Sequence, residues 1–297
     1  MFIVDSQVHI WAPDSPERPW NADGAKRLVL MGHRVETLGI VELRARMQEA
    51  GVARAIIVPP SWEGDRIDLG LAAAHAYPDQ FAVMARIPLA RPDEARKLLD
   101  AWRTEPGIKG TRLTFHRPQD IGWLTDGTAD WYWPLAEERG IPTMVHAPTL
   151  KKELGEVARA HPRLKMIVDH MGVLGHERDD AIGPWIDETI KLAALPNVYV
   201  KVSALPGYST QPYPYANLNP YINRVVKAFG ARRCFWGTDL SRMLGRCGLT
   251  YTEVVQHALH HLDFLSASDL EWIMGRAICE CLNWPIPAEN ELQKKIT

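Results

Sequence analysis

Residues 164–172 read LKMIVDHMG, a short apolar run that ends in an aspartate and a histidine. The run over Lys165–Asp169 is nearly continuous in apolar character, as expected of a parallel strand that is buried on both faces. Segments with helical periodicity flank it, over Leu150–His161 and Ile182–Leu195. A buried strand between two helices of about 10–15 residues is typical of a βαβ unit in a parallel sheet.

The same pattern recurs along the chain. Eight apolar, β-rich runs alternate with helical segments, and right-handed crossovers repeated in this way close a sheet into a barrel. We therefore predict an α/β fold, a (β/α)8 TIM barrel of one domain over residues 1–297, with extended loops after strands one and seven. The alternative is a doubly wound open sheet, which is disfavoured because no GxGxxG motif follows the first strand. The predicted strands are Phe2–Val8, Arg54–Val58, Phe81–Ile87, Ile108–Phe115, Pro142–His146, Lys165–Asp169, Val198–Val202 and Cys234–Trp236.

Composition narrows the classes of partner. The chain has 34 Lys and Arg against 36 Asp and Glu, so no basic surface for nucleic acid is expected. No apolar stretch approaches the roughly 20 residues that a membrane helix needs, and no secretory signal is visible at the N-terminus. The four cysteines form no CxxC pair and are interpreted as reduced thiols. We expect a cytoplasmic protein that binds a small acidic, cyclic molecule, with aromatic loops that would allow a homodimer.

Polar side chains follow most of the predicted strands. Because all strands of a parallel barrel end at one face, these side chains should meet at one mouth. Three histidines and an aspartate at four strand ends are harder to attribute to chance than one histidine. They are His9, His146, His170 and Asp239, at the ends of strands one, five, six and eight. The histidines in loops and helices are interpreted as ordinary satisfied polar residues: His33, His75, His161, His176, His257, His260 and His261.

These strand ends suggest a hydrolytic site. Asp239 is the best candidate for a general base, because a carboxylate in a barrel mouth can take a proton from attacking water. His170 would polarise a carbonyl or stabilise an oxyanion. Arg112 is suited to bind a substrate carboxylate, and a buried structural ion pair is an equal alternative. Trp11, Trp62 and the loop after strand seven suggest an aromatic wall. The predicted substrate-binding residues are Gln7, Ser61, Trp62, Arg112, His116, Arg117 and Tyr208.

Two further buried charges receive structural interpretations. Lys201 lies within the apolar stretch VYVKVSA and is interpreted mainly as a lysine that pairs with a buried carboxylate. Asp169, at the end of strand six, is interpreted as a structural residue, either a strand-end cap or a group that orients a neighbour.

Several stretches resemble the amidohydrolase superfamily, in the amidohydrolase-related branch that includes sugar lactonases, 2-pyrone-4,6-dicarboxylate lactonases and metal-dependent aromatic decarboxylases. The resemblance extends almost from end to end. It is carried by VDSQVHIW (4–11), GIKGTRLTF (107–115), MVHAP (144–148), IVDHMG (167–172), FWGTDLS (235–241) and IMGRAICECLNW (273–284).

The resemblance implies metal ligands at the strand ends. In that superfamily strand one usually carries a His-x-His pair, and strands five, six and eight supply His, His and Asp. Gln7 stands in place of the first histidine, and its amide oxygen is a poorer partner for zinc than imidazole. The resemblance therefore implies either one divalent ion (Zn or Mn) held by His9, His146 and Asp239, with Gln7 as a further candidate ligand, or no metal.

Three functions follow from these features. The first is a hydrolase that opens a lactone-like or other cyclic ester bearing a carboxylate, through water activated by Asp239. The second is a metal-dependent decarboxylase of an aromatic or muconate-type acid. The third is a barrel that only binds a ligand, which the intact set of His9, His146, His170 and Asp239 disfavours.

Overall fold

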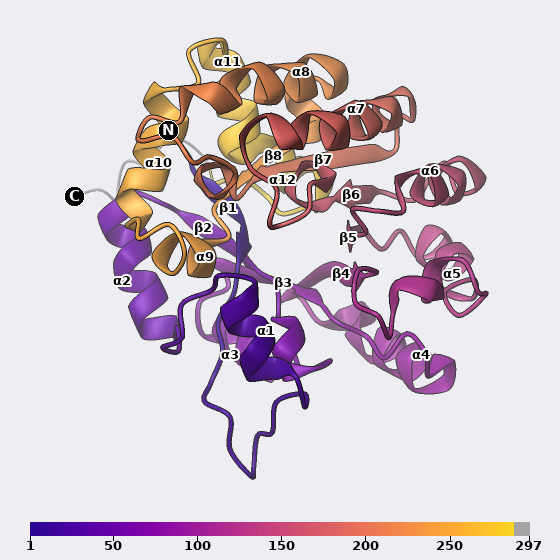
Figure 1. Cartoon of the computed structure of the whole chain (residues 1–297). Helices are drawn as coiled ribbons and strands as arrows, with labels where there is room; N and C mark the ends of the chain where they lie inside the picture. Colours follow the sequence, from indigo (N-terminus) through magenta and orange to yellow (C-terminus); the bar gives the residue numbers. More distant parts are fainter. Residues whose placement is uncertain (288–297) are drawn as a thin grey trace.

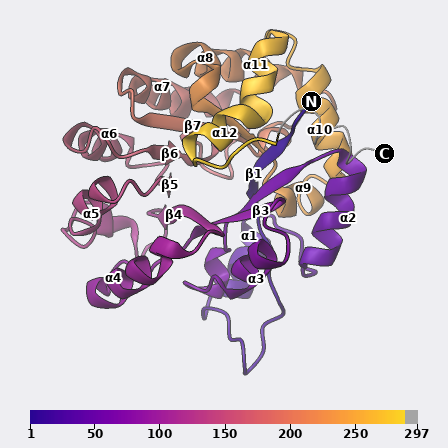
Figure 2. The same ribbon diagram turned by 180° about the vertical axis from the view of Figure 1, so that it is seen from behind.

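A computed structural model describes residues 1–287. Eight parallel strands run in the order β1 to β8 and form a nearly closed barrel, with helices packed around its outside (Figure 1, Figure 2). The predicted barrel is confirmed, and each predicted strand is present with ends shifted by at most two residues. The strands are β1 (Val4–Val8), β2 (Arg54–Ile57), β3 (Phe81–Ala85), β4 (Ile108–Thr114), β5 (Thr143–His146), β6 (Met166–Val168), β7 (Val198–Ser203) and β8 (Cys234–Gly237).

The helices follow the strands as predicted, with two additions. Helix α1 (Gly24–Leu30) lies within the long connection after β1, and helix α9 (Leu240–Leu244) directly follows β8. Near the end of the described chain, a π-helical segment at Trp272–Arg276 joins the short helices α11 (Ala267–Glu271) and α12 (Ala277–Cys281). The others are α2 (Ile40–Ala50), α3 (Asp68–Ala76), α4 (Pro92–Ala101), α5 (Tyr132–Glu138), α6 (Lys151–Ala160), α7 (Gly183–Lys191), α8 (Asn219–Phe229) and α10 (Tyr251–His260).

The seam between β8 and β1 is held largely by side chains. Both carboxylate oxygens of Asp5 in β1 accept hydrogen bonds from Thr238, one from its N–H and one from its hydroxyl. Just beyond the seam, the N–H of Asp239 donates to the carbonyl of Gln7 at 2.9 Å. Gly237 allows this approach, because a Cβ there would lie 2.6 Å from Ser6 Oγ. The sequence thus fixes Gln7 and Asp239 next to each other.

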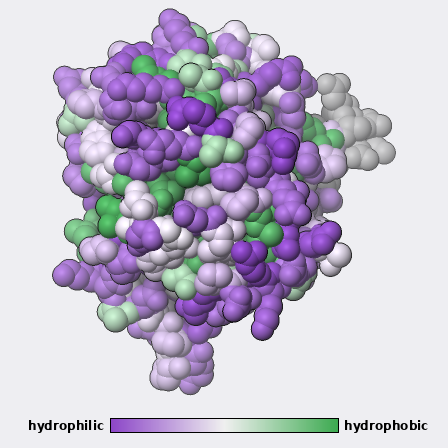
Figure 3. Space-filling view, turned by 90° about the vertical axis from the view of Figure 1, so that its right-hand side faces the viewer, coloured by the Kyte–Doolittle hydropathy of each residue, from purple (hydrophilic) through white to green (hydrophobic). Residues whose placement is uncertain are grey.

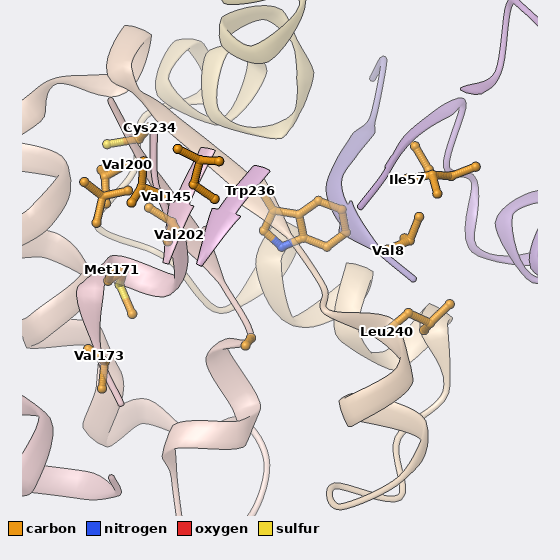
Figure 4. Packing of buried hydrophobic residues seen from close by; sticks show 14 of the residues in the cluster. Val8, Ile57, Val145, Met171, Val173, Val200, Val202, Cys234, Trp236 and Leu240 are labelled. Atoms are coloured by element: carbon orange, nitrogen blue, oxygen red, sulfur yellow. The ribbon is translucent and has the colours of Figure 1, made fainter. Parts of the chain in front are cut away.

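Apolar side chains fill the barrel and the layer beneath the helices. Trp236 in β8 lies between its own strand and β1, near Val8 (Figure 4). Both side chains are almost fully buried, at 2% and 0% exposure, so this packing also closes the seam. On the face shown in Figure 3, hydrophilic side chains predominate and apolar ones lie scattered between them. None of the described helices is both long enough and apolar enough to cross a membrane.

Candidate active site

A cavity opens at the carboxyl ends of the strands, with about 620 Å³ of empty space that includes its solvent-open mouth. Nearly all of the predicted site residues line it, as expected for side chains that leave parallel strands at one face. They are Gln7, His9, Ser61, Trp62, Arg112, His116, His146, His170, Tyr208 and Asp239.

Two predicted residues lie elsewhere. Arg117 does not line the cavity, because its guanidinium forms an ion pair with Asp120 three residues away. Trp11 was expected in the aromatic wall but is buried behind Trp62, which its ring contacts edge-on at 5.4 Å between centroids. The wall of the cavity is instead formed by Trp62 and the buried Tyr208.

Nε2 of His9 and Oδ1 of Asp239 lie close together in the cavity. Nδ1 of His9 lies 2.5 Å from the carbonyl of Val58 and must therefore donate, which leaves Nε2 of the neutral ring as an acceptor. This Nε2 lies 3.3 Å from Oδ1 of Asp239. Since neither atom carries a proton when His9 is neutral, the space beside them suits a water molecule, a proton or a cation.

Gln7 is held in one orientation by a buried lysine. Nζ of Lys201 donates to Oε1 of Gln7 at 2.6 Å, so the amide nitrogen faces the cavity and lies 3.3 Å from Nε2 of His9. Lys201 also forms an ion pair with Asp169 at 3.0 Å, and Asp169 pairs with Arg112 at 2.7 Å. The geometry agrees with the structural interpretations of Lys201 and Asp169, and it occupies the Gln7 oxygen that would coordinate a metal.

Asp239 is ionised at any pH at which the protein is expected to work. Burial alone would raise its pKa, but the adjacent imidazoles of His9, His33 and His170 outweigh burial and hold the pKa well below the usual value. Its second oxygen lies 3.6 Å from Nη1 of Arg242. The backbone of Asp239 is left-handed, with φ of 55°, a conformation that Asp tolerates better than most residues.

His170 projects from a strained turn. Its φ is 52° and that of Met171 is 53°, both in the left-handed region. The turn continues through Gly172, where a Cβ would lie 2.5 Å from Cε of Lys151. Nδ1 of His170 is 2.8 Å from Oγ of Ser203, which fixes the ring. Burial lowers the pKa of His170 to about 4, so the imidazole is neutral near pH 7.

The structure adds five polar residues that the sequence analysis did not assign to the site, one of which is Thr114 at the end of β4. Arg27 and His33 reach the cavity from the long connection after β1, Arg86 follows β3, and Arg242 lies on α9. The interpretation of His33 as an ordinary polar residue outside the site is wrong, because its ring packs between His9 and Trp62. The sequence held a signal for Arg86 and for Arg242, since Arg86 is the second-to-last residue of a predicted strand and Arg242 follows Asp239 by three residues.

The side chains of the cavity determine whether a divalent ion could be held there. Within residues 1–287 no group of three or more His, Cys, Asp or Glu is arranged to hold a metal ion. His9 and Asp239 offer two donor atoms, whereas a catalytic zinc usually has three protein ligands. The arrangement therefore does not fit a resident ion. Ligation by His9, His146 and Asp239 stays a prediction.

Several known proteins are similar to this chain. An L-fucono-1,5-lactonase of Burkholderia ambifaria is 27% identical over 261 residues, which is 83% of each chain. A zinc-bound amidohydrolase from Burkholderia multivorans aligns with a TM-score of 0.78 at 20% identity, over 96% of this chain and 100% of that chain. A probable 2-pyrone-4,6-dicarboxylic acid hydrolase from Acinetobacter baumannii, with citric acid bound, aligns with a TM-score of 0.74 at 17% identity. The alignment covers 96% of this chain and 100% of that chain.

The same fold carries a different chemistry elsewhere. The 5-carboxyvanillate decarboxylase of Sphingomonas paucimobilis aligns with a TM-score of 0.68 at 13% identity, over 95% of this chain and 99% of that chain. Likenesses at these identities establish the fold alone.

The family is established by the sequence itself. Residues 4–282 match the family model described as amidohydrolase. This segment contains every residue that lines the cavity. The prediction of an amidohydrolase-type enzyme is thereby confirmed, and the chain belongs to the amidohydrolase family.

Proposed function

We propose that this protein hydrolyses a lactone-like cyclic ester that carries a carboxylate. The observation that supports this most is the pair of acceptor atoms, Nε2 of His9 and Oδ1 of Asp239, 3.3 Å apart inside a cavity rich in arginine. Oδ1 of Asp239 has no hydrogen-bond partner among the described residues, so it can accept from a water molecule whose lone pairs are then directed toward a substrate in the cavity.

In the proposed reaction, water attacks the ester carbonyl while Asp239 takes its proton. His170 stabilises the oxyanion, because Ser203 can donate to Nδ1 and leave the proton on Nε2. The tetrahedral intermediate then collapses, the ring C–O bond breaks, and the proton on Asp239 passes to the leaving oxygen. The product is an open-chain hydroxy acid.

The substrate is held by side chains around this centre. Arg112 offers its outer nitrogens, since Nε is already paired with Asp169. The amide nitrogen of Gln7 can donate to a substrate oxygen, because Lys201 occupies its oxygen. Trp62 and Tyr208 flank a flat ring.

A panel of lactones tests this proposal. Ring opening releases a proton, so a pH-indicator assay detects it directly, and the variant Asp239→Asn should abolish the signal. If no lactone of the panel is opened above the rate of that variant, the proposed hydrolysis is wrong. Elemental analysis before and after chelation tests the predicted metal. A stoichiometric ion that is lost together with activity would show that these metal-free steps are incomplete.

The alternative is decarboxylation of an aromatic or muconate-type acid. It is favoured by the arginine-lined cavity and by the decarboxylase that shares this fold. In that reaction the ring carbon would be protonated as carbon dioxide leaves, by Nε2 of His170 or by Asp239 after it has taken a proton from a substrate hydroxyl or from water. Carbon dioxide released from hydroxybenzoates would favour this alternative, and lactone consumption without gas would favour hydrolysis.

A further inference from the structure

Arg86 is a buried cation that forms no ion pair with the residues that the structure describes. It directly follows β3, lines the cavity and is only 6% exposed. Nη2 donates to Oγ1 of Thr114 at 3.3 Å, and Nε has no hydrogen-bond partner among the described residues. Within residues 1–287 the guanidinium forms no ion pair with any carboxylate.

The other buried arginines of the cavity are compensated. Arg112 pairs with Asp169 at 2.7 Å, and Arg242 lies 3.6 Å from Asp239 while also donating to the carbonyl of Gly175. A guanidinium that is removed from water without a partner is strongly unfavourable. Burial, and then the charge of Arg112, accordingly lower the pKa of Arg86 to about 9. Such a group is expected where a ligand supplies the missing charge.

Its surroundings form an anion site. Thr114 supplies a hydroxyl beside Arg86, and Arg27 reaches the same side of the cavity from α1. Nη2 of Arg27 lies 3.2 Å from Nε2 of His116, so this imidazole tethers Arg27. Burial, and then the charges of Arg27 and Arg112, lower the pKa of His116 to about 3, which keeps the ring neutral. The wall formed by β3 and β4 is therefore positively charged.

We propose that Arg86, together with Thr114 and Arg27, binds a carboxylate of the substrate on the β3–β4 side of the cavity. The site and Asp239 line the same cavity, the site at β3 and β4 and Asp239 at the end of β8. The bound carboxylate is therefore remote from the ester bond that breaks. The proposal rests on the proposed hydrolysis and assigns the residues that hold the carboxylate of its cyclic ester substrate. An uncharged sugar lactone would leave Arg86 buried and unpaired.

The test is binding of citrate, which is not a lactone and is not turned over. We expect Arg86→Met to weaken the calorimetric affinity for citrate by about 30-fold or more, because a buried charge pair is lost. Without citrate, the melting temperature should stay the same or rise, because an unpaired buried charge is removed. Arg91→Met is the matched control, since Arg91 is exposed and pairs with Glu94 outside the cavity.

Two results would overturn this assignment. One is an affinity of Arg86→Met for citrate within about threefold of the wild type. The other is a loss of stability without ligand, or failure to fold, which would make Arg86 a structural residue. Arg86→Lys, which keeps the charge, should bind citrate more tightly than Arg86→Met does, and equal weakening in both variants would also count against the site.

Turnover separates this inference from the proposed function. We expect Arg86→Met to lose activity on 2-pyrone-4,6-dicarboxylate, and the control Arg91→Met to keep it. If the wild type opens no lactone yet binds citrate through Arg86, the proposed hydrolysis fails and the anion site stands. If the wild type opens the dicarboxylate and Arg86→Met does so equally well, the anion site fails and hydrolysis stands.

Discussion

Two aspartates at the seam between β1 and β8 are equally buried but differently surrounded. Asp5, beneath the cavity, accepts hydrogen bonds from the N–H groups of Gln7 and Thr238 and from the hydroxyls of Thr238 and Tyr251. Burial raises its pKa in spite of these bonds. Asp239, in the cavity, lies between His9 and Arg242, and its pKa is held well below the usual value.

The difference separates the site into two layers. In the lower layer, Asp5 accepts hydrogen bonds and Asp169 forms ion pairs with Lys201 and Arg112, and these contacts fix the residues above them. In the upper layer, Oδ1 of Asp239 and Nε of Arg86 have no hydrogen-bond partner among the described residues, and neither of these two atoms lies in a close pair of opposite full charges when His9 is neutral. Because unsatisfied buried groups are unfavourable, they are tolerated where a ligand completes them. Changes in the lower layer should therefore alter stability, and changes in the upper layer should alter turnover.

The largest effect is expected from Asp239→Asn. Asn tolerates the left-handed backbone at this position, so the fold should be kept. An amide cannot take the proton of the attacking water, and we expect kcat to fall by about 10³-fold. Steady-state kinetics on a lactone that the wild type opens would measure this loss. A kcat close to the wild-type value would remove Asp239 from the catalytic step.

Asp5→Asn is the matched control for that change. The amide N–H₂ of Asn would face N–H and O–H donors, so buried hydrogen bonds are lost, at about 1–3 kcal/mol of unfolding free energy. The folded variant should keep most of its kcat, because Asp5 does not line the cavity. If Asp5→Asn lost kcat as strongly as Asp239→Asn, the division into two layers would be wrong.

Lys201→Met should mainly lower stability. It removes the cation between Asp169 and Gln7, and breaking a buried ion pair is destabilising by about 3 kcal/mol. Chemical denaturation measures this loss, with Lys227→Met on the exposed surface of α8 as the control. The amide of Gln7 would also become free to turn, so KM should rise. Unchanged stability would show that Lys201 is not held as an ion pair.

Arg112→Met tests a residue that belongs to both layers. Its Nε pairs with Asp169 below, and its side chain lines the cavity above. We expect KM for a carboxylated lactone to rise by about tenfold or more, as the loss of one charge-assisted contact implies. KM for an uncharged lactone should change much less. Equal changes for both substrates would return Arg112 to a purely structural role.

Much of the fold and part of the site follow from the sequence. The eight buried strands could be predicted because parallel strands covered on both faces are apolar throughout. His9, His146, His170 and Asp239 could be predicted to meet because strand ends converge on one face of a barrel.

The residues that were missed or misplaced depend on long-range packing. His33 and Arg27 lie in the long connection after β1, whose path is set by contacts with Ser241, His116 and Trp62, far away in the sequence. Arg117 was predicted to bind substrate, but its guanidinium pairs with Asp120. The periodicity of the sequence does not reveal which partner a side chain takes. Arg86 could have been predicted from the sequence, since it is a charged residue near the end of a predicted strand, within the apolar stretch MARIP.

The smallest expected effect is that of pH on kcat. Burial lowers the pKa of His170 to about 4, and the pKa of Asp239 lies well below its usual value, so neither group changes charge between pH 6 and 8. We expect kcat to be nearly constant over that range and to fall only as the pH approaches about 4, where His170 becomes protonated. A pH profile of kcat on a lactone substrate measures this, and a half-loss near pH 6.5 would mean that His170 titrates like an exposed histidine.

Stability must be followed in the same experiment. The folded-state pKa of His170 lies below its unfolded value of about 6.5, so the unfolded chain binds more protons as the pH falls between these values. The buried His33 and His116, with pKa values lowered to about 3, act in the same direction. Unfolding free energy should therefore decrease as the pH drops below about 6.5 while kcat of the folded protein stays constant. If kcat and stability instead decline together from pH 6.5, the neutral histidines of the upper layer act in catalysis through their titration, and the sharp division between the two layers does not hold.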